Sequence, residues 1–366
     1  MGSVTPSSPD ATGGSSPSDD TSDATMPLGE ASSGDATATS APPEEDTGPA
    51  RDTDASEPHD NTRPDENTDE EPAPEDPEPT DDTSEPAPGD PASGSCTPSI
   101  ATGTRAGGTG PHDVVVETNS DPGINEGTIF RPADLGGSEK YPIFVWGQGA
   151  CSRNGLANAT AMAEIASHGY FVVADGTPNG SGNRTMDRGD LDGMGAPLMA
   201  YVDWALAENE KPCSTYYQSL EPTKIASNGF SCGGLMAQGT VLDPRIVTWG
   251  VTSSGMAGAT QEFYDAIHTP VLFVEGGPDE VAYEGGLQGY DRISELGVPV
   301  MWFDKPLGHG GDLFDADGGD FTRINLAWLN WWLKGDETET GKGLLVGATC
   351  PYCSDATWDV RSANLP

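Results

Sequence analysis

One serine of this chain lies in a sequence that can present a hydroxyl for nucleophilic attack. Residues 229–233 read Gly-Phe-Ser-Cys-Gly, after a strand-like run over 224–228 and before a helix-like run over 235–241. A serine attacks only when a base takes its proton, so it must stand on a tight turn that both an imidazole and a substrate can reach. Glycines two residues away on either side permit this turn, because without a Cβ atom they let the helix pass close to the strand. The pattern predicts that Ser231 is a nucleophile on a strand-turn-helix.

A base and an acid follow the serine in the chain. His309, in Leu-Gly-His-Gly-Gly, comes after the last predicted strand, whereas the three other histidines beyond residue 95 precede strands or end a helix. His309 is therefore the predicted base. The strand over 271–274 is followed by a turn with two adjacent carboxylates, Asp279 and Glu280. We predict Asp279 as the acid, from its spacing after the strand, with Glu280 as the alternative. In such a triad the acid orients the histidine and stabilises its protonated form.

These residues need a scaffold, and the apolar pattern predicts an α/β fold. Eight strand-like runs and five helix-like segments alternate from the third strand onward, which is typical of a mostly parallel sheet with helices on both faces. We expect the first two strands to form an antiparallel hairpin at one edge, and reactive groups to gather at the carboxyl ends of the strands. The predicted strands lie at 114–116, 127–130, 143–146, 171–174, 224–226, 246–251, 271–274 and 300–303, and the helices at 156–167, 197–208, 235–242, 287–296 and 321–333.

Composition divides the chain near residue 95. Residues 1–95 contain no Phe, Trp, Tyr or Cys and carry 25 acidic but only 2 basic side chains, out of 59 and 17 in the whole chain. Such a segment cannot bury a core, so we predict a disordered acidic tail followed by one folded domain over 96–366. A solvated spacer between an anchor point and the domain is favoured over an arm that binds cations or a basic partner.

Charge and hydropathy also bear on the partners. The folded part is itself acidic, with 34 acidic against 15 basic residues, which argues against nucleic acid because phosphate contacts need clustered Lys and Arg. No apolar run is long enough to span a membrane. The first residues lack the basic and apolar regions of a secretory signal, yet a long Ser/Thr/Pro/Asp stalk is typical of proteins held at the cell envelope behind a cleaved leader. We expect a secreted or envelope-associated protein, extracellular or periplasmic.

All six cysteines lie at or beyond residue 96, and their even number permits up to three disulfides among 15 pairings. The pair in Cys350-Pro-Tyr-Cys353 favours a structural disulfide, or two separate bridges, over a redox or zinc half-site, because no second such pair or nearby histidine completes a ligand set. Cys232 is interpreted as a small packing residue. Two acidic glycine loops, 187–193 and 312–320, lack the spacing of an EF-hand, so no metal and no cofactor is predicted. Asp320 is expected to cap the following helix.

The elbow at 229–234, the helix-to-strand run Ile-Ala-Ser-His-Gly-Tyr-Phe-Val-Val over 165–173 and the closing Gly-His-Gly-Gly over 308–311 resemble the α/β-hydrolase superfamily. The likeness is to secreted serine esterases of the dienelactone-hydrolase-like and polyester-hydrolase-like groups, and it covers about 99–366. It implies an α/β-hydrolase fold and a serine carboxylester hydrolase that forms an acyl-enzyme on small or polymeric esters. A serine peptidase or amidase, and a binding module that has lost catalysis, stay as alternatives.

The same resemblance bears on the acid and on the oxyanion hole. Members with the sequence GGPSDIAY align Glu280, not Asp279, with the acid. One oxyanion donor should be the backbone N–H of Cys232. The other should come from the loop after the third strand, where similarity to polyester hydrolases indicates Ala150 and adjacency to the strand indicates Gln148.

Overall fold

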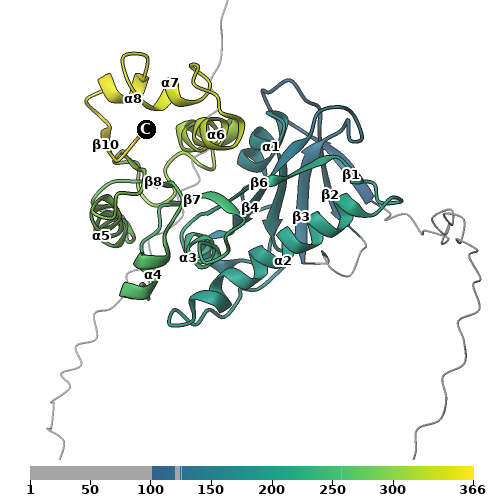
Figure 1. The fold of residues 1–366 in the computed structure, drawn as a ribbon, viewed down its shortest axis with the longest axis horizontal. Helices are drawn as coiled ribbons and strands as arrows, with labels where there is room; N and C mark the ends of the chain where they lie inside the picture. The colour runs from purple at the N-terminus through teal and green to yellow at the C-terminus, as the bar shows by residue number, and fades with distance from the viewer. Residues whose placement is uncertain (1–100, 120–123, 125, 257) are drawn as a thin grey trace, which may run out of the picture. The chain divides into compact units, whose positions relative to one another are not determined.

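The computed structural model describes residues 101–119, 124, 126–256 and 258–366. These residues form an α/β fold in which helices cover both faces of a ten-stranded, mostly parallel sheet (Figure 1). The predicted tail, residues 1–95, lies outside the described residues, as does Cys96. For the described part of the chain, the predicted α/β class with a mostly parallel sheet is confirmed.

The sheet has the strand order β1-β2-β3-β5-β4-β6-β7-β8-β9-β10. The five neighbouring pairs from β5 to β9 are parallel, and the pairs toward both edges are antiparallel. All eight predicted strands are present, but β1 and β10 extend the sheet at its edges, so the predicted number was wrong. The strands are β1 (Ala101–Ala106), β2 (Val114–Asn119), β3 (Gly127–Pro132), β4 (Tyr141–Gly147), β5 (Phe171–Asp175), β6 (Leu220–Gly229), β7 (Ile246–Thr252), β8 (Val271–Glu275), β9 (Val300–Asp304) and β10 (Asp359–Ala363).

The two missed strands have little apolar character. β1 reads ATGTRA and β10 reads DVRSA, so neither shows the alternation by which a strand is recognised. Each is held by antiparallel backbone pairing to one neighbour, β2 or β9. The predicted hairpin of β2 and β3 is antiparallel, but β1 places it one strand in from the edge.

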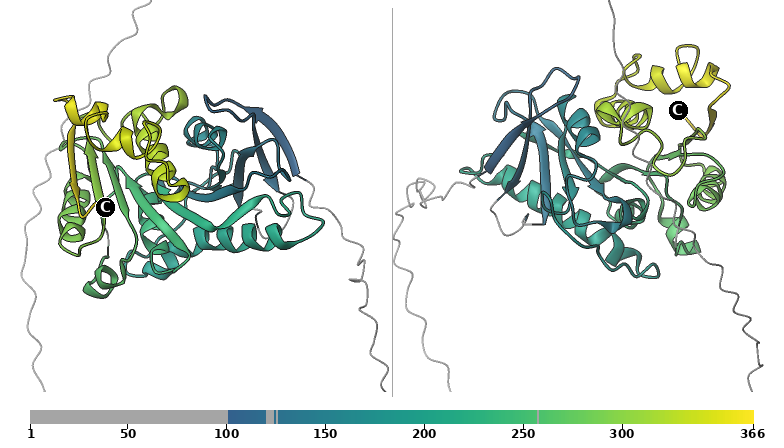
Figure 2. Two further views of the ribbon diagram at one scale, coloured as in Figure 1. Left: turned by 45° about the horizontal axis from the view of Figure 1, so that its top comes forward. Right: turned by 180° about the vertical axis from the view of Figure 1, so that it is seen from behind.

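Helices α1 and α6 cover one face of the sheet, and α2, α3, α4 and α5 cover the other (Figures 1 and 2). All five predicted helices are present with shifted ends, and three short ones were missed. The bounds are α1 (Ala159–Ser167), α2 (Leu191–Glu210), α3 (Cys232–Thr240), α4 (Gln261–Ala266), α5 (Tyr283–Ser294), α6 (Gly319–Lys334), α7 (Lys342–Leu345) and α8 (Pro351–Ser354), with 3-10 turns η1 (Gly149–Cys151) and η2 (Ala316–Gly318).

The strand β4 shows how the sheet is buried on both sides. Ile143 and Val145 pack toward α2 and α3, whereas Phe144 and Trp146 pack toward α1 and α6, and all four are at most 1% exposed. A strand with both faces buried reads as a continuous apolar run, which is why this segment was recognised from its sequence. The centre of the sheet is therefore a rigid support for the loops at its ends.

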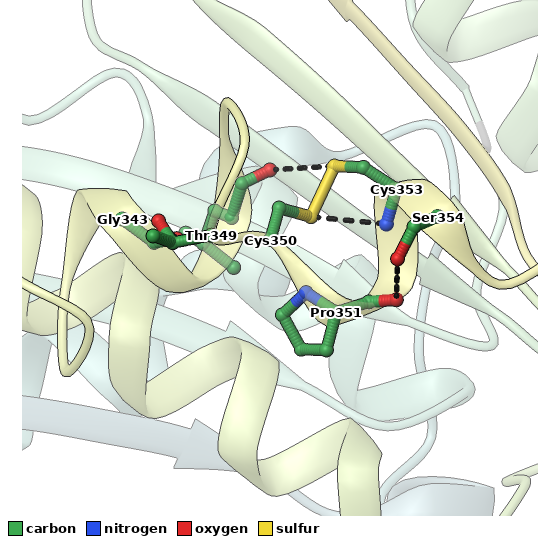
Figure 3. The surroundings of a disulfide bond; sticks show 7 residues. Gly343, Thr349, Cys350, Pro351, Cys353 and Ser354 are labelled. Atoms are coloured by element: carbon green, nitrogen blue, oxygen red, sulfur yellow. Dashed lines mark hydrogen bonds between the residues drawn. A yellow bond between two sulfur atoms is a disulfide. The ribbon is translucent and has the colours of Figure 1, made fainter.

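Two disulfides are defined within the described residues. Cys350–Cys353 closes a short loop at the start of α8, where the Cys350 sulfur accepts a hydrogen bond from the Cys353 N–H at 3.0 Å (Figure 3). Cys151–Cys232 joins η1 to the first residue of α3. Cys213 is disulfide-bonded as well.

Candidate active site

The chain order of the strands places a crevice at the end of β4. From β4 the chain passes through α1 to β5 on one side, and then through α2 to β6 on the other side. When the loops after two neighbouring strands run in opposite directions, a crevice opens between them. This place in the strand order is called a topological switch point, and ligands bind there, beyond the carboxyl ends of the strands. Gly147 and Gly229, the last residues of β4 and β6, are register partners, so the loops that follow them start side by side.

Ser231 stands on the sharp turn that follows β6. Its backbone has φ 53° and ψ −119°, which is unfavourable for a residue with a Cβ atom. The turn is held by its neighbours: the Ser231 N–H donates to the Thr252 carbonyl at 2.9 Å, and the Ser254 hydroxyl donates to the Ser231 carbonyl at 2.7 Å. Strain of this kind persists where the surroundings over-determine it, which is typical of functional positions.

The flanking glycines are required by close backbone contacts. A Cβ atom on Gly233 would lie 2.0 Å from the Gly147 carbonyl oxygen, and one on Gly229 would lie 2.2 Å from the Gly233 carbonyl oxygen. Neither contact leaves room for a side chain, because both opposing atoms belong to backbone. The glycines thus bring α3, β4 and β6 together and leave Ser231 at the tip of the turn.

His309 lies on the loop after β9 and is oriented by a buried carboxylate. Its Nδ1 lies 2.5 Å from Oε2 of Glu280, whose side chain is fully buried. The other carboxylate oxygen of Glu280 accepts the Gly276 N–H at 3.3 Å. The imidazole also packs on the Phe230 ring, with centroids 4.9 Å apart. The carboxylate contact at Nδ1 and the ring contact together orient the imidazole.

The carboxylate that meets His309 is therefore Glu280, and our preference for Asp279 is corrected on this point. Residues 277–280 form a turn in which the Glu280 N–H donates to the Gly277 carbonyl at 3.1 Å. Pro278 and Asp279 occupy its two central positions and are exposed, while Glu280 leaves the turn buried. The Gly-Pro-Asp-Glu sequence is itself a turn signal, since proline favours the second position of a β-turn. That signal could have selected Glu280.

The loops that carry Glu280 and His309 are joined by backbone contacts. The Gly308 N–H donates to the Gly276 carbonyl at 2.7 Å, and the Gly277 N–H donates to Oδ1 of Asp304 at 2.6 Å. The Gly310 N–H donates to the Ser253 hydroxyl at 3.0 Å. The loop after β8 and the loop after β9 consequently form one unit, so the acid and the histidine keep a common position.

Two further carboxyl groups lie behind Glu280, and sequence reasoning missed both. Burial raises the pKa of Glu275 well above its ordinary value, and the neighbouring Glu280 raises it further. Burial also raises the pKa of Asp304 to about 6, against the lowering effect of the Gly277 N–H. Both groups end buried strands, where a charged residue is an uncommon sequence signal.

Ser231 and His309 line one cavity of about 470 Å³. Among the described residues that line this cavity, Arg188 has the one permanently charged side chain. Of the expected oxyanion residues, Ala150 and Cys232 line this cavity, whereas Gln148 is completely buried outside it and donates from its side chain to the Gly155 carbonyl. The remaining lining residues are Leu235, Ser254, Gly255, Met256, Val281, Ala282 and Gly285.

The Cys232 N–H belongs to the first turn of α3, where backbone donors have no partner within the helix. The N–H groups of Ser231, Gly233 and Gly234 are used within the elbow region, but no acceptor among the described residues takes that of Cys232. Its side chain packs against the core, as interpreted, but it is also bonded to Cys151, which the sequence did not indicate. The arrangement offers a backbone N–H beside Ser231 and a second loop, at Ala150, that lines the same cavity.

The two acidic loops have structural roles. Asp312 accepts the N–H groups of Asp320 and Phe321 at 2.8 and 3.0 Å, so Asp312 rather than Asp320 caps α6, which begins at Gly319. Asp190 caps α2 by accepting the Gly193 N–H at 2.9 Å. Within the residues that the structure describes, no group of three or more His, Cys, Asp or Glu side chains is arranged to hold a metal ion.

Comparison with known proteins finds no family model that matches the chain and no curated protein that matches it. In the described part of the chain, none of the helices combines the length and the apolar character that a membrane span requires. The function is therefore argued from the site itself.

Proposed function

We propose that this chain is a serine carboxylester hydrolase with an α/β-hydrolase fold, and that Ser231, His309 and Glu280 are its catalytic triad. The observation that carries the proposal is the His309 imidazole, held at Nδ1 by a buried carboxylate and lining the same cavity as a serine on a strained turn. The chain order of serine, acid and histidine, and the position of the serine between β6 and α3, support the α/β-hydrolase assignment.

The proposed reaction follows from the donors and acceptors of the site. Nε2 of His309 accepts the Ser231 proton as the hydroxyl oxygen attacks the ester carbonyl, while Nδ1–H donates to Glu280. The negative charge that develops on the carbonyl oxygen is stabilised by the N–H groups of Cys232 and Ala150. His309 then protonates the leaving alcohol, and an acyl group remains on Ser231. Water attacks this acyl-enzyme with His309 as the base, which releases the acid and restores the serine.

The disulfides support a secreted or envelope-associated location, because such bonds persist in oxidising compartments. The resemblance to polyester-hydrolase-like enzymes supports accessible esters, small or polymeric, as substrates. Fold alone does not separate esters from amides. Turnover of matched ester and amide substrates by one preparation distinguishes the proposed activity from that of a peptidase.

The proposal is tested by hydrolysis of p-nitrophenyl esters of increasing acyl length, combined with fluorophosphonate labelling. We expect Ser231→Ala to abolish both turnover and labelling while near-ultraviolet circular dichroism stays unchanged. Ser294→Ala is a matched control, because Ser294 is only partly buried, at the end of α5, and lies outside the cavity lining. A folded Ser231→Ala protein that keeps more than a few per cent of the activity would refute the assignment.

A further inference from the structure

The disulfide Cys151–Cys232 joins the two backbone segments that would bind the oxyanion. Cys232 directly follows Ser231, and Cys151 directly follows Ala150, while the two Cα atoms lie 5.1 Å apart. Ala150 and Cys232 both line the cavity. The disulfide therefore links the loop after β4 directly to the first turn of α3.

The loop after β4 is held in an unfavourable backbone conformation. Ala150 has φ 54° and Cys151 has φ 50°, so two consecutive residues with side chains adopt the left-handed region. Isolated residues of this kind are uncommon, and they persist only when other contacts impose them. Backbone hydrogen bonds tie the loop to itself and to residues 177–184, among them Arg184 N–H to the Cys151 carbonyl at 2.7 Å, Arg153 N–H to the Gly182 carbonyl at 2.9 Å and Ser152 N–H to the Gly149 carbonyl at 3.0 Å. Among the described residues, none of the loop's backbone hydrogen bonds reaches α3.

We propose that Cys151 and Cys232 are positioning residues, whose disulfide holds the backbone N–H groups of Ala150 and Cys232 at the separation that the oxyanion requires. This inference rests on the proposed ester hydrolysis and adds to it a covalent support that the reaction itself does not use. Without the bond, the strained loop can relax toward ordinary backbone angles and carry the Ala150 N–H away from Cys232.

The expected effect lies in the chemical step. Oxyanion donors act where charge develops in the transition state, so their displacement lowers kcat more than it raises KM. A misplacement of about 1 Å can cost about 100-fold in rate. We therefore expect a loss of about 10- to 100-fold in kcat with KM changed less than about 3-fold.

The chain provides a matched control in its other defined disulfide. Cys350–Cys353 lies at α8, and neither cysteine lines the cavity of Ser231. The double variants Cys151→Ala/Cys232→Ala and Cys350→Ala/Cys353→Ala each remove one disulfide and leave no unpaired thiol from it. Alanine at 232 keeps the backbone N–H, so the variant loses the disulfide and its two sulfur atoms but not the donor. Both variants are compared with the unaltered enzyme on one p-nitrophenyl ester.

We expect the first double variant to lose kcat as stated and the second to stay within about 2-fold of the unaltered enzyme. A folded Cys151→Ala/Cys232→Ala protein with kcat within about 3-fold of the control would overturn the proposal. A variant in which KM rises while kcat is unchanged would also overturn it, because that pattern indicates loss of an interaction made equally in the ground state and the transition state.

Reduction under native conditions covers the case in which the first variant does not fold. Dithiothreitol reduces a disulfide to two thiols and is itself oxidised to its cyclic disulfide. We expect it to slow the Cys350→Ala/Cys353→Ala enzyme while circular dichroism is unchanged, and removal of the reductant in air to restore the rate. No slowing, although alkylation and peptide mass spectrometry show that Cys151 and Cys232 are reduced, would overturn the proposal. Absence of ester turnover and of Ser231 labelling in the unaltered enzyme would instead refute the proposed function.

Discussion

Replacing Glu280 by glutamine should remove most of the activity, although the two side chains have the same shape. Oε1 of Glu280 accepts the Gly276 N–H, Oε2 meets Nδ1 of His309, and Glu275 lies beside the carboxylate. An amide has one oxygen and one NH₂ group. Only its oxygen can accept the Gly276 N–H, so the NH₂ group must face His309.

An NH₂ group facing Nδ1 forces that nitrogen to accept a hydrogen bond, and the ring proton then moves to Nε2. In this tautomer Nε2 cannot accept the Ser231 proton. The imidazolium also loses the carboxylate that stabilises it. In a serine hydrolase triad the equivalent change lowers kcat by about 10⁴, so we expect a loss of about 10³–10⁴ for Glu280→Gln with KM nearly unchanged.

Asp279→Asn is the matched control, because Asp279 is adjacent in the chain but exposed. We expect it to keep at least about half of the activity, as is usual for surface substitutions. Both variants and the unaltered enzyme are assayed on one p-nitrophenyl ester across pH, and each is checked for folding by circular dichroism. If Asp279→Asn loses activity and Glu280→Gln keeps it, the contact between Glu280 and His309 does not operate in catalysis.

Three further perturbations probe the scaffold. Gly233→Ala should destabilise the fold by about 1–3 kcal/mol and lower activity, because its Cβ would lie 2.0 Å from a backbone oxygen; Gly107→Ala, with open space around the Cβ, is the control in thermal melts. Burial raises the pKa of Asp304 from 3.8 to about 6. The folded state therefore favours the protonated form of this group, and the resulting contribution to the free energy of unfolding is complete below pH 4 and is lost as pH rises through 6. Relative to Asp304→Asn, the unaltered protein should lose about 1–2 kcal/mol of unfolding free energy between pH 4 and 7. Denaturant titrations in which the two proteins change equally in unfolding free energy over this range would contradict the prediction. Removing the disulfide Cys350–Cys353, whose cysteines are 3 residues apart, should cost about 2 kcal/mol of unfolding free energy by loop-closure entropy; a loss above about 4 kcal/mol in urea titrations would show that α8 depends on the bond.

Several elements were readable in the sequence because local chemistry determines them. Central strands such as β4 and β8 are buried on both faces, and burial requires uninterrupted apolar runs whatever the neighbours are. Gly229 and Gly233 are required by a backbone approach that no other residue tolerates, so their spacing around Ser231 is a signal in itself. The place of His309 after the last central strand followed from the alternation of strands and helices.

Other features were decided by contacts between distant segments. Strands β1 and β10 have no apolar pattern, and backbone pairing to β2 and β9 makes them strands. The pairing of Cys151 with Cys232, 81 residues apart, depends on β4 and β6 ending side by side. Sequence selected Ser231 and His309 as candidates, but spacing after the strand did not choose correctly between Asp279 and Glu280. Adjacent carboxylates look alike in a chain, and only the turn at 277–280 decides which one is buried against the imidazole.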